Sequence, residues 1–165
     1  MTDHISVLTQ YMTRPTEKLV KAAYRVMGYL VGTPHFNIWY TTPAYPELRN
    51  RIYAACDASF ADDRPTRKSQ QGHLIFYNSG PIIWKSNRQR TIALSTTEAE
   101  LDSFVRCVRS VLHTMRILEN MGSPQDGVNI FEDNRSTIAI CTNTLKVEVI
   151  IYCQLSGKCT MGIRV

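Results

Sequence analysis

The sequence predicts a mixed α/β fold, in which helices pack on a sheet and the elements follow the order β-β-β-α-β-α, with an incomplete C-terminal part. Two observations favour this class. After Arg51 the apolar residues change from a helical period to the alternation of strands, and three short strand-like runs follow. A long amphipathic segment then leads to one more strand and helix. This succession is typical of an α+β or α/β layer of helix on sheet.

Length and composition exclude several classes of protein. A chain of 165 residues allows one ordinary domain plus an appendage, and 44% hydrophobic with 20% charged residues excludes wholesale disorder. No stretch approaches the roughly 18 to 20 apolar residues of a membrane span, and no secretory signal begins the chain, so we expect an intracellular, soluble protein. The odd count of five cysteines, without a secretory signal, argues against a disulfide framework. The cysteines form no C-x-x-C pair and the four histidines no H-x-x-x-H spacing, which argues against a structural zinc site.

Residues 1–50 are expected to form a separate N-terminal piece. A helix is predicted from Ser6 to about Leu30, with Thr16 as a cap within it, and residues 36–40 alternate as a short strand would. A proline-punctuated connector, residues 41–50, then marks the domain boundary.

The second region, residues 51–143, is predicted to contain the sheet. Strands are expected at residues 52–56, 72–78 and 81–86, which would form an antiparallel meander. The buried face of the following long helix is expected to carry Leu101, Phe104, Val105, Val108, Leu112, Met115 and Leu118. A strand at residues 128–131 and a helix at residues 135–141 complete the order.

The last region, residues 144–165, differs in character. Residues 147–151 could form a strand, whereas residues 154–165 show no sustained period and little charge. We therefore expect a divergent tail that does not complete the domain.

Three acidic side chains are expected to converge at one edge of the sheet. Asp57 ends the first strand, Glu98 or Glu100 lies in the first turns of the long helix, and Asp133 follows the later strand. Converging carboxylates repel one another unless a cation joins them, and oxygen ligands suit Mg²⁺ or Mn²⁺. Two such ions about 4 Å apart can support phosphodiester hydrolysis.

The two helix glutamates have different explanations. Ser95 and Glu98 fit the S-x-x-E capping box, in which the glutamate folds back on the helix start. Thr97 and Glu100 fit the same pattern, so the assignment remains open. Glu100 is favoured as the ligand because it precedes Leu101, at the edge of the predicted buried face.

A basic segment accompanies these acids. No acidic residue occurs between Arg64 and Thr97, and the segment carries six cations that could hold phosphates near the metal site. These are Arg64, Arg67, Lys68, Lys85, Arg88 and Arg90. Trp84, Tyr77 and His73 could stack on bases or contact sugars. The alternative is a solvated basic face with core aromatic residues.

Five ordered motifs resemble the ribonuclease H domain of copia-type retrotransposon polyproteins. They are ACDASFADD at 55–63, RKSQQG at 67–72, GPIIWKS at 80–86, ALSTTEAEL at 93–101 and FEDNRSTIA at 131–139. The motifs LTQYM at 8–12 and GYLVGTP at 28–34 resemble the segment that follows the reverse transcriptase in the same polyproteins. The resemblance makes residues 1–50 a remnant of the C-terminal, or connection, region of that enzyme.

The resemblance implies a ribonuclease H-like fold in which Asp57, Glu100 and Asp133 hold two Mg²⁺ or Mn²⁺ ions and hydrolyse the RNA strand of an RNA–DNA hybrid. It implies as partners that hybrid and the reverse transcriptase and integrase portions of the same polyprotein, with no membrane. The expected location is the cytoplasm, within a virus-like particle, or the nucleus.

The chain departs from the family after Asn143. There the family continues with a basic, histidine-containing stretch that carries a fourth catalytic aspartate, followed by a helix. Residues 144–165 contain no Asp or His, and Glu148 is their only acid and a possible substitute ligand. A frame disruption or truncation would explain this. It predicts impaired activity, and the alternative function is an inactive fragment that at most binds nucleic acid.

Overall fold

The computed structural model describes residues 5, 8–145, 148–153 and 159–164, with side chains described as far as Asn143. Contacts divide the chain into two units, Met1–Trp39 and Tyr40–Val165, which are described separately. Residues 40–50, which the sequence groups with the N-terminal piece, thus fall in the second unit. Among the described helices, none is long and apolar enough to cross a membrane.

The first unit is dominated by helix α2, Glu17–Gly32. The prediction of one continuous helix from Ser6 to about Leu30 is wrong, because residues 10–16 are not helical; Ser6 itself lies outside the described residues. Pro15 disfavours helical backbone at Arg14, whose amide donates to the Tyr11 carbonyl in a turn. Thr16 occupies the cap position, but its side chain makes no capping hydrogen bond. No residue of α2 is buried.

The strand predicted at residues 36–40 is not observed. A strand is stabilised by a neighbouring ladder, and this segment pairs with none of the described strands; Phe36 is 67% and Trp39 73% exposed. Within the second unit, the Tyr40 hydroxyl donates to the Pro81 carbonyl at 2.8 Å, a side-chain contact rather than a ladder bond.

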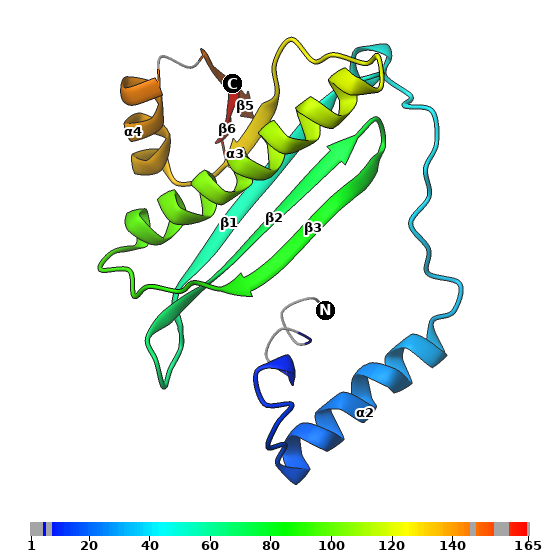
Figure 1. Ribbon diagram of the computed structural model, residues 1–165, viewed down its shortest axis with the longest axis vertical. Coiled ribbons are helices and arrows are strands. Elements are labelled where there is room, and N and C mark those ends of the chain that lie inside the picture. The colour runs from blue at the N-terminus through cyan, green and yellow to red at the C-terminus, as the bar shows by residue number, and fades with distance from the viewer. Residues whose placement is uncertain (1–4, 6–7, 146–147, 154–158, 165) are drawn as a thin grey trace. The chain divides into compact units, whose positions relative to one another are not determined.

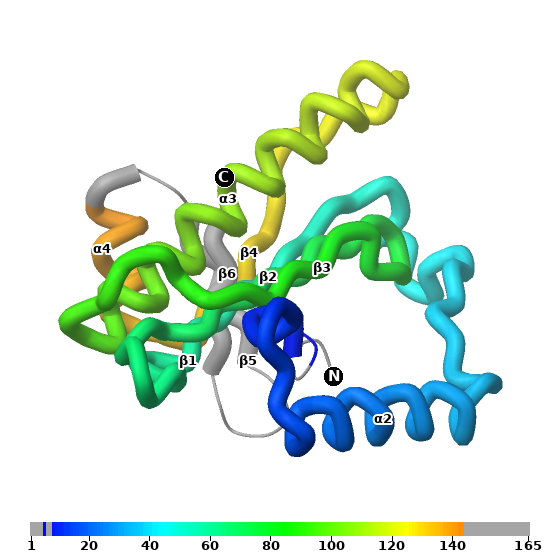
Figure 2. Tube along the Cα trace, turned by 60° about the horizontal axis from the view of Figure 1, so that its bottom comes forward, coloured from blue at the N-terminus to red at the C-terminus, as the bar shows by residue number. Residues whose placement is uncertain are grey.

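The second unit contains the sheet (Figure 1). Strands β1 (Ile52–Asp63), β2 (Lys68–Tyr77) and β3 (Gly80–Arg88) form the predicted antiparallel meander. Helix α3 (Thr96–Asn120) lies over one face of this meander, as the turned view of Figure 2 shows. Strand β4 (Asn129–Glu132) then pairs with β1 in parallel, and helix α4 (Arg135–Leu145) follows. The predicted order β-β-β-α-β-α is therefore observed in a mixed α/β unit.

The C-terminal region adds two strands, β5 (Glu148–Cys153) and β6 (Cys159–Arg164). The sheet has six strands in the order β3-β2-β1-β4-β6-β5, and β6 pairs antiparallel with β4. The prediction of a tail that does not complete the domain is corrected at Cys159–Arg164, which joins the sheet as β6. Its sequence lacks alternation, but the free edge of β4 offers backbone partners that do not depend on side chains.

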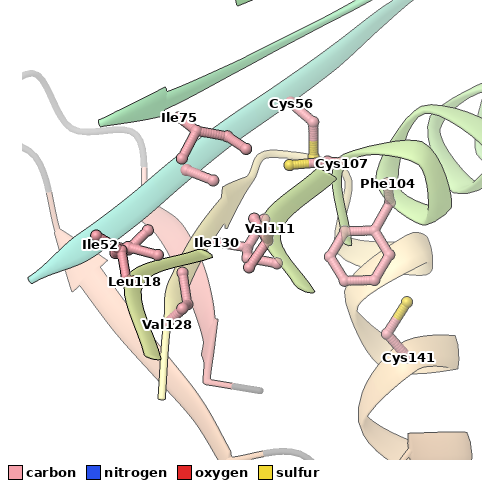
Figure 3. Close-up of a cluster of buried hydrophobic side chains, with 11 residues drawn as sticks. Ile52, Cys56, Ile75, Phe104, Cys107, Val111, Leu118, Val128, Ile130 and Cys141 are labelled. Atoms are coloured by element: carbon pink, nitrogen blue, oxygen red, sulfur yellow. The ribbon is translucent and has the colours of Figure 1, made fainter. Parts of the chain in front are cut away.

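The hydrophobic core lies between α3 and the sheet, and Figure 3 shows the two groups of side chains facing each other. It comprises Ile52, Ala54, Cys56, Ile75, Phe104, Cys107, Val111, Leu118, Val128, Ile130 and Cys141. The predicted helix face is only partly correct, because Val105 and Leu112 are 40% and 41% exposed. The buried face also includes Ser103 and Thr114. Because both residues are polar, a pattern of apolar residues does not predict their burial.

Candidate metal centre

Three carboxylates from three elements meet in the second unit. Asp57 lies in β1, Glu100 in α3 and Asp133 directly after β4, and one potential ligand oxygen from each lies within 4.8 Å of the others. The parallel register explains how the two aspartates meet. The β1–β4 ladder ends at the pair Ala55 and Phe131, so Asp57 and Asp133 each stand two residues beyond the last pair, at the same edge.

Hydrogen bonds at the start of α3 separate the two glutamates. The Ser95 hydroxyl accepts from the Glu98 amide at 3.1 Å, and the Glu98 carboxylate accepts from the Leu94 amide at 2.7 Å. Together they cap the helix start as a variant of the predicted box, because the Glu98 carboxylate reaches the amide one residue before the cap and not that of Ser95 itself. Glu98 is exposed, whereas Glu100 is buried and belongs to the carboxylate cluster.

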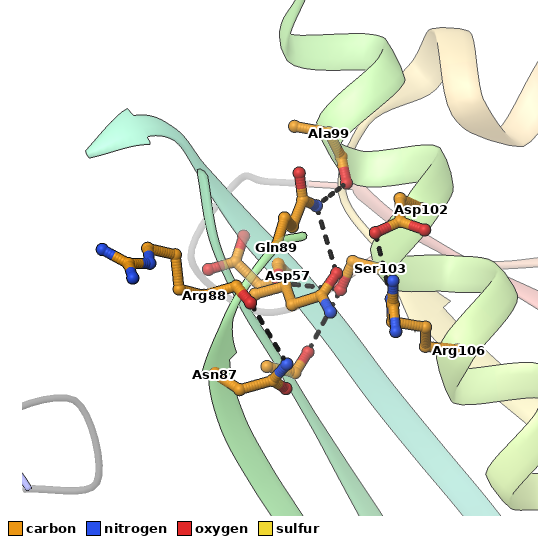
Figure 4. Close-up of polar contacts among 10 residues, drawn as sticks. Asp57, Asn87, Arg88, Gln89, Ala99, Asp102, Ser103 and Arg106 are labelled. Atoms are coloured by element: carbon orange, nitrogen blue, oxygen red, sulfur yellow. Dashed lines mark hydrogen bonds and ion pairs between the residues drawn. The ribbon is translucent and has the colours of Figure 1, made fainter. Parts of the chain in front are cut away.

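Two polar contacts fasten α3 to the sheet beside the cluster (Figure 4). The Ser103 hydroxyl donates to the Asp57 carbonyl at 2.9 Å and lies 3.3 Å from the Gly72 carbonyl. The Gln89 amide, just after β3, donates to the Ala99 carbonyl at 2.8 Å. The helix therefore holds Glu100 at a fixed place beside the strand that carries Asp57.

The environment of Glu100 suits a cation. The residue is 7% exposed, and its Oε2 atom has no hydrogen-bond partner in the described part of the chain. Burial, with the negative charges of Glu132, Asp57 and Asp133, raises the Glu100 pKa to about 8. A buried carboxylate with an unused oxygen and acidic neighbours is stabilised by a bound cation, and an all-oxygen donor set fits a hard divalent ion.

Glu132 is a buried acid that the sequence analysis missed. It is 1% exposed, it accepts a hydrogen bond from the Cys56 thiol at 3.2 Å, and its other oxygen accepts from the Asn134 amide at 3.2 Å. Burial raises its pKa to about 7. Strand alternation could have revealed it, because Glu132 shares the inward face of β4 with Ile130. Its charge adds to the negative potential around the cluster.

The six predicted phosphate contacts are spread over several places. Arg64 and Arg67 lie in the β1–β2 turn, Lys68 begins β2, Lys85 and Arg88 lie in β3, and Arg90 follows β3. Arg88 is engaged in an ion pair with Asp63 at 2.6 Å. The Thr66 hydroxyl and this arginine lower the Asp63 pKa.

The aromatic candidates differ in accessibility. Trp84 is 50% exposed, whereas His73 is 8% exposed. Tyr77 donates from its hydroxyl to Asn50 at 2.6 Å, which gives it a structural role at the base of the meander. The remaining site prediction, Glu148 as a substitute ligand, concerns a side chain outside the described residues.

Comparison with known proteins relates the chain to retroelements. It is 29% identical over 140 residues to the retrovirus-related Pol polyprotein from transposon RE1 of Arabidopsis thaliana, covering 84% of this chain and 9% of that protein. It is 28% identical over 141 residues to the corresponding polyprotein from transposon TNT 1-94 of Nicotiana tabacum, covering 86% and 10%. It is also 34% identical over 96 residues to secreted RxLR effector protein 161 of Plasmopara viticola, covering 58% and 65%.

No family model and no solved structure matches the chain. The chain spans about a tenth of the length of the curated polyproteins that it matches. It is therefore related to one short segment of retrotransposon Pol polyproteins.

Proposed function

We propose that residues 51–143 form the main part of a ribonuclease H-like domain that hydrolyses the RNA strand of RNA–DNA hybrids during retrotransposon replication. The observation that carries the proposal is the convergence of Asp57, Glu100 and Asp133, with ligand oxygens within 4.8 Å of one another. The relation to retrotransposon Pol polyproteins supports it. The proposed partners are the hybrid and the reverse transcriptase and integrase portions of an intact polyprotein.

The three carboxylates would hold Mg²⁺ or Mn²⁺, and two ions are expected in an active site. When bound, such ions activate a water molecule and stabilise the leaving oxygen of the phosphodiester. The chain's own part is to position the oxygens on two neighbouring strands and one helix. Glu100 would bind as the carboxylate, so ion binding would release its proton wherever the pH lies below its pKa of about 8.

The basic residues would orient the substrate through its phosphates. Arg64, Arg67, Lys68, Lys85 and Arg90 make no ion pair with another described residue, whereas Arg88 shares its charge with Asp63. We expect Arg88 to contribute least to binding, because its guanidinium is already paired.

The decisive experiment measures cleavage of a labelled RNA–DNA hybrid by the purified chain. Cleavage should require Mg²⁺ or Mn²⁺, and Asp133→Asn should abolish it. The matched control is Asp126→Asn, an exposed aspartate in the loop before β4, which should cleave like the unmodified chain. Cleavage that survives Asp133→Asn would contradict the assignment.

The alternative is an inactive fragment that at most binds nucleic acid. It is favoured by the composition of residues 144–165, where Glu148 is the only acid. It predicts salt-sensitive binding of the hybrid, which stays intact in the presence of Mg²⁺ or Mn²⁺. Metal-dependent turnover by the unmodified chain would exclude this alternative.

A further inference from the structure

A basic groove lies between α3 and the edge strand β3, apart from the carboxylate cluster. Its volume is about 590 Å³, and the lining residues used below are His73 from β2, Lys85 from β3, and Arg106 and Arg109 from α3. Three of these four carry a full positive charge. None of the residues that line the groove in the described part of the chain is acidic.

Two geometric relations bring the cations together. In the β2–β3 ladder His73 lies directly opposite Lys85, so both stand in the same row across the sheet. Arg106 and Arg109 are three residues apart on α3, a spacing that places them on the same side of a helix. The groove is therefore built from two different elements, and its charge does not come from one surface stripe.

The three cations differ in how far they are already neutralised. The Arg106 Nε atom donates to the Asp102 carboxylate at 3.0 Å, which fixes its guanidinium at the groove and partly balances its charge. Lys85 and Arg109 form no ion pair with any other described residue. Two positive charges thus remain to attract an anion.

His73 gives a second, independent indication of a ligand. It is 8% exposed, yet its Nε2 atom has no hydrogen-bond partner among the described residues. A buried polar atom without a partner is unfavourable, and native proteins rarely leave one unpaired. An anion in the groove would accept the hydrogen bond that Nε2 can donate, and it would offset the repulsion between the cations.

We propose that this groove binds phosphate groups of a nucleic-acid backbone. Arginine and lysine side chains around a polar recess are typical of phosphate contacts. The similarity to retrotransposon Pol polyproteins favours nucleic acid over an acidic peptide, and in this choice the inference rests on the proposed function.

The groove is distinct from the proposed metal centre. Arg109 lies nine residues after Glu100 on α3, about 13 Å along the helix axis at about 1.5 Å per residue. A phosphate held there is remote from the three carboxylates, so binding needs neither metal nor turnover. The inference therefore goes beyond the proposed hydrolysis and can be tested without it.

The test measures binding of a fluorescein-labelled RNA–DNA hybrid by fluorescence anisotropy in EDTA, over a range of salt concentrations. The double variant Lys85→Gln with Arg109→Gln should bind about tenfold more weakly at low salt, and the slope of log K against log salt should fall by about 1.8, for two lost phosphate contacts. Both side chains are exposed, so the fold should persist, which circular dichroism would check.

Two controls isolate the groove. Arg116→Gln removes an exposed charge from the same helix outside the groove and should leave the slope unchanged. Lys85→Arg with Arg109→Lys keeps both charges and should retain the affinity within about twofold. Because the assay is run in EDTA, where the proposed cleavage has no metal, this result is separate from the outcome of the cleavage assay. The proposal would be overturned if the double variant bound the hybrid as tightly as the unmodified chain, or if Arg116→Gln lost as much affinity as the double variant.

NMR of the His73 ring protons provides the second readout. They should shift when an unlabelled oligonucleotide is added to the unmodified chain, and this shift should disappear in the double variant. If poly-glutamate displaces the hybrid equally well, the groove recognises acidic peptides instead. If inorganic pyrophosphate binds as tightly as the oligonucleotide, the groove is a free-phosphate site. Either result would overturn the assignment to a nucleic-acid backbone.

Discussion

Replacing Glu100 by glutamine should stabilise the metal-free chain at neutral and alkaline pH. The Glu100 pKa rises from the ordinary 4.5 to about 8 on folding, so the folded state prefers the protonated carboxyl. A raised pKa favours the folded state below about pH 4.5, and this advantage is lost as the pH rises toward 8. Glutamine has the shape of the protonated acid and does not ionise, so Glu100→Gln should escape this loss.

The magnitude follows from the difference between the two pKa values. At about 1.36 kcal/mol per pH unit, ionising Glu100 in the folded chain costs roughly 5 kcal/mol if the group is isolated. Asp57 and Asp133 are exposed, and water reaches the cluster and screens these charges. We therefore expect a measured difference of about 2 to 3 kcal/mol at pH 8 and little difference at pH 4.

Urea denaturation in EDTA, followed between pH 4 and pH 9, measures this difference. The matched control is Glu98→Gln, which keeps the capping box because glutamine serves there as well as glutamate. Glu132, with a pKa of about 7, adds a pH dependence of the unfolding free energy that is present in all variants. If Glu100→Gln and Glu98→Gln follow the same curve, the carboxylate cluster does not destabilise the metal-free chain and the reasoning is refuted.

Three further predictions concern the parts around the cluster. Ser103→Ala removes the hydroxyl that bonds two strand carbonyls, so it should lower the free energy of unfolding in urea by about 1 kcal/mol. It should also weaken Mn²⁺ binding in calorimetry. Ser59→Ala, at an exposed position, should do neither. Phe104→Ala should cost about 3 to 5 kcal/mol, since the ring is 1% exposed, and Val105→Ala should cost much less. Cys56 should resist iodoacetamide at pH 8 until urea unfolds the chain, because the neighbouring Cys107 and burial raise its pKa well above the usual value; rapid native-state labelling would contradict this.

The sequence places Asp133 correctly after its strand, whereas the prediction that Asp57 ends the first strand is wrong, because β1 continues to Asp63. Asp57 still meets Asp133 because the parallel ladder of β1 with β4 ends two residues before each of them. The sequence could favour Glu100 over Glu98 as the ligand but could not decide between them, because both fit a capping box. The structure separates them through the hydrogen bonds of Ser95 and Leu94.

Other features could not be read from apolar periodicity. The buried face of α3 includes Ser103 and Thr114, which become buried because they bond to backbone carbonyls. Arg106 and Arg109 face the groove from within a helix whose sequence pattern indicated packing. Glu132 was passed over because a glutamate in a short strand does not by itself indicate burial.

Strand β6 keeps β4 in the interior of the sheet. With β1 on one side and β6 on the other, β4 is an interior strand, and its backbone groups are used on both edges. Deleting Cys159–Arg164 would make β4 an edge strand, with the backbone groups that now pair with β6 left open. The least regular part of the sequence thus moves the open edge of the sheet to β5, away from the strand that leads to Asp133.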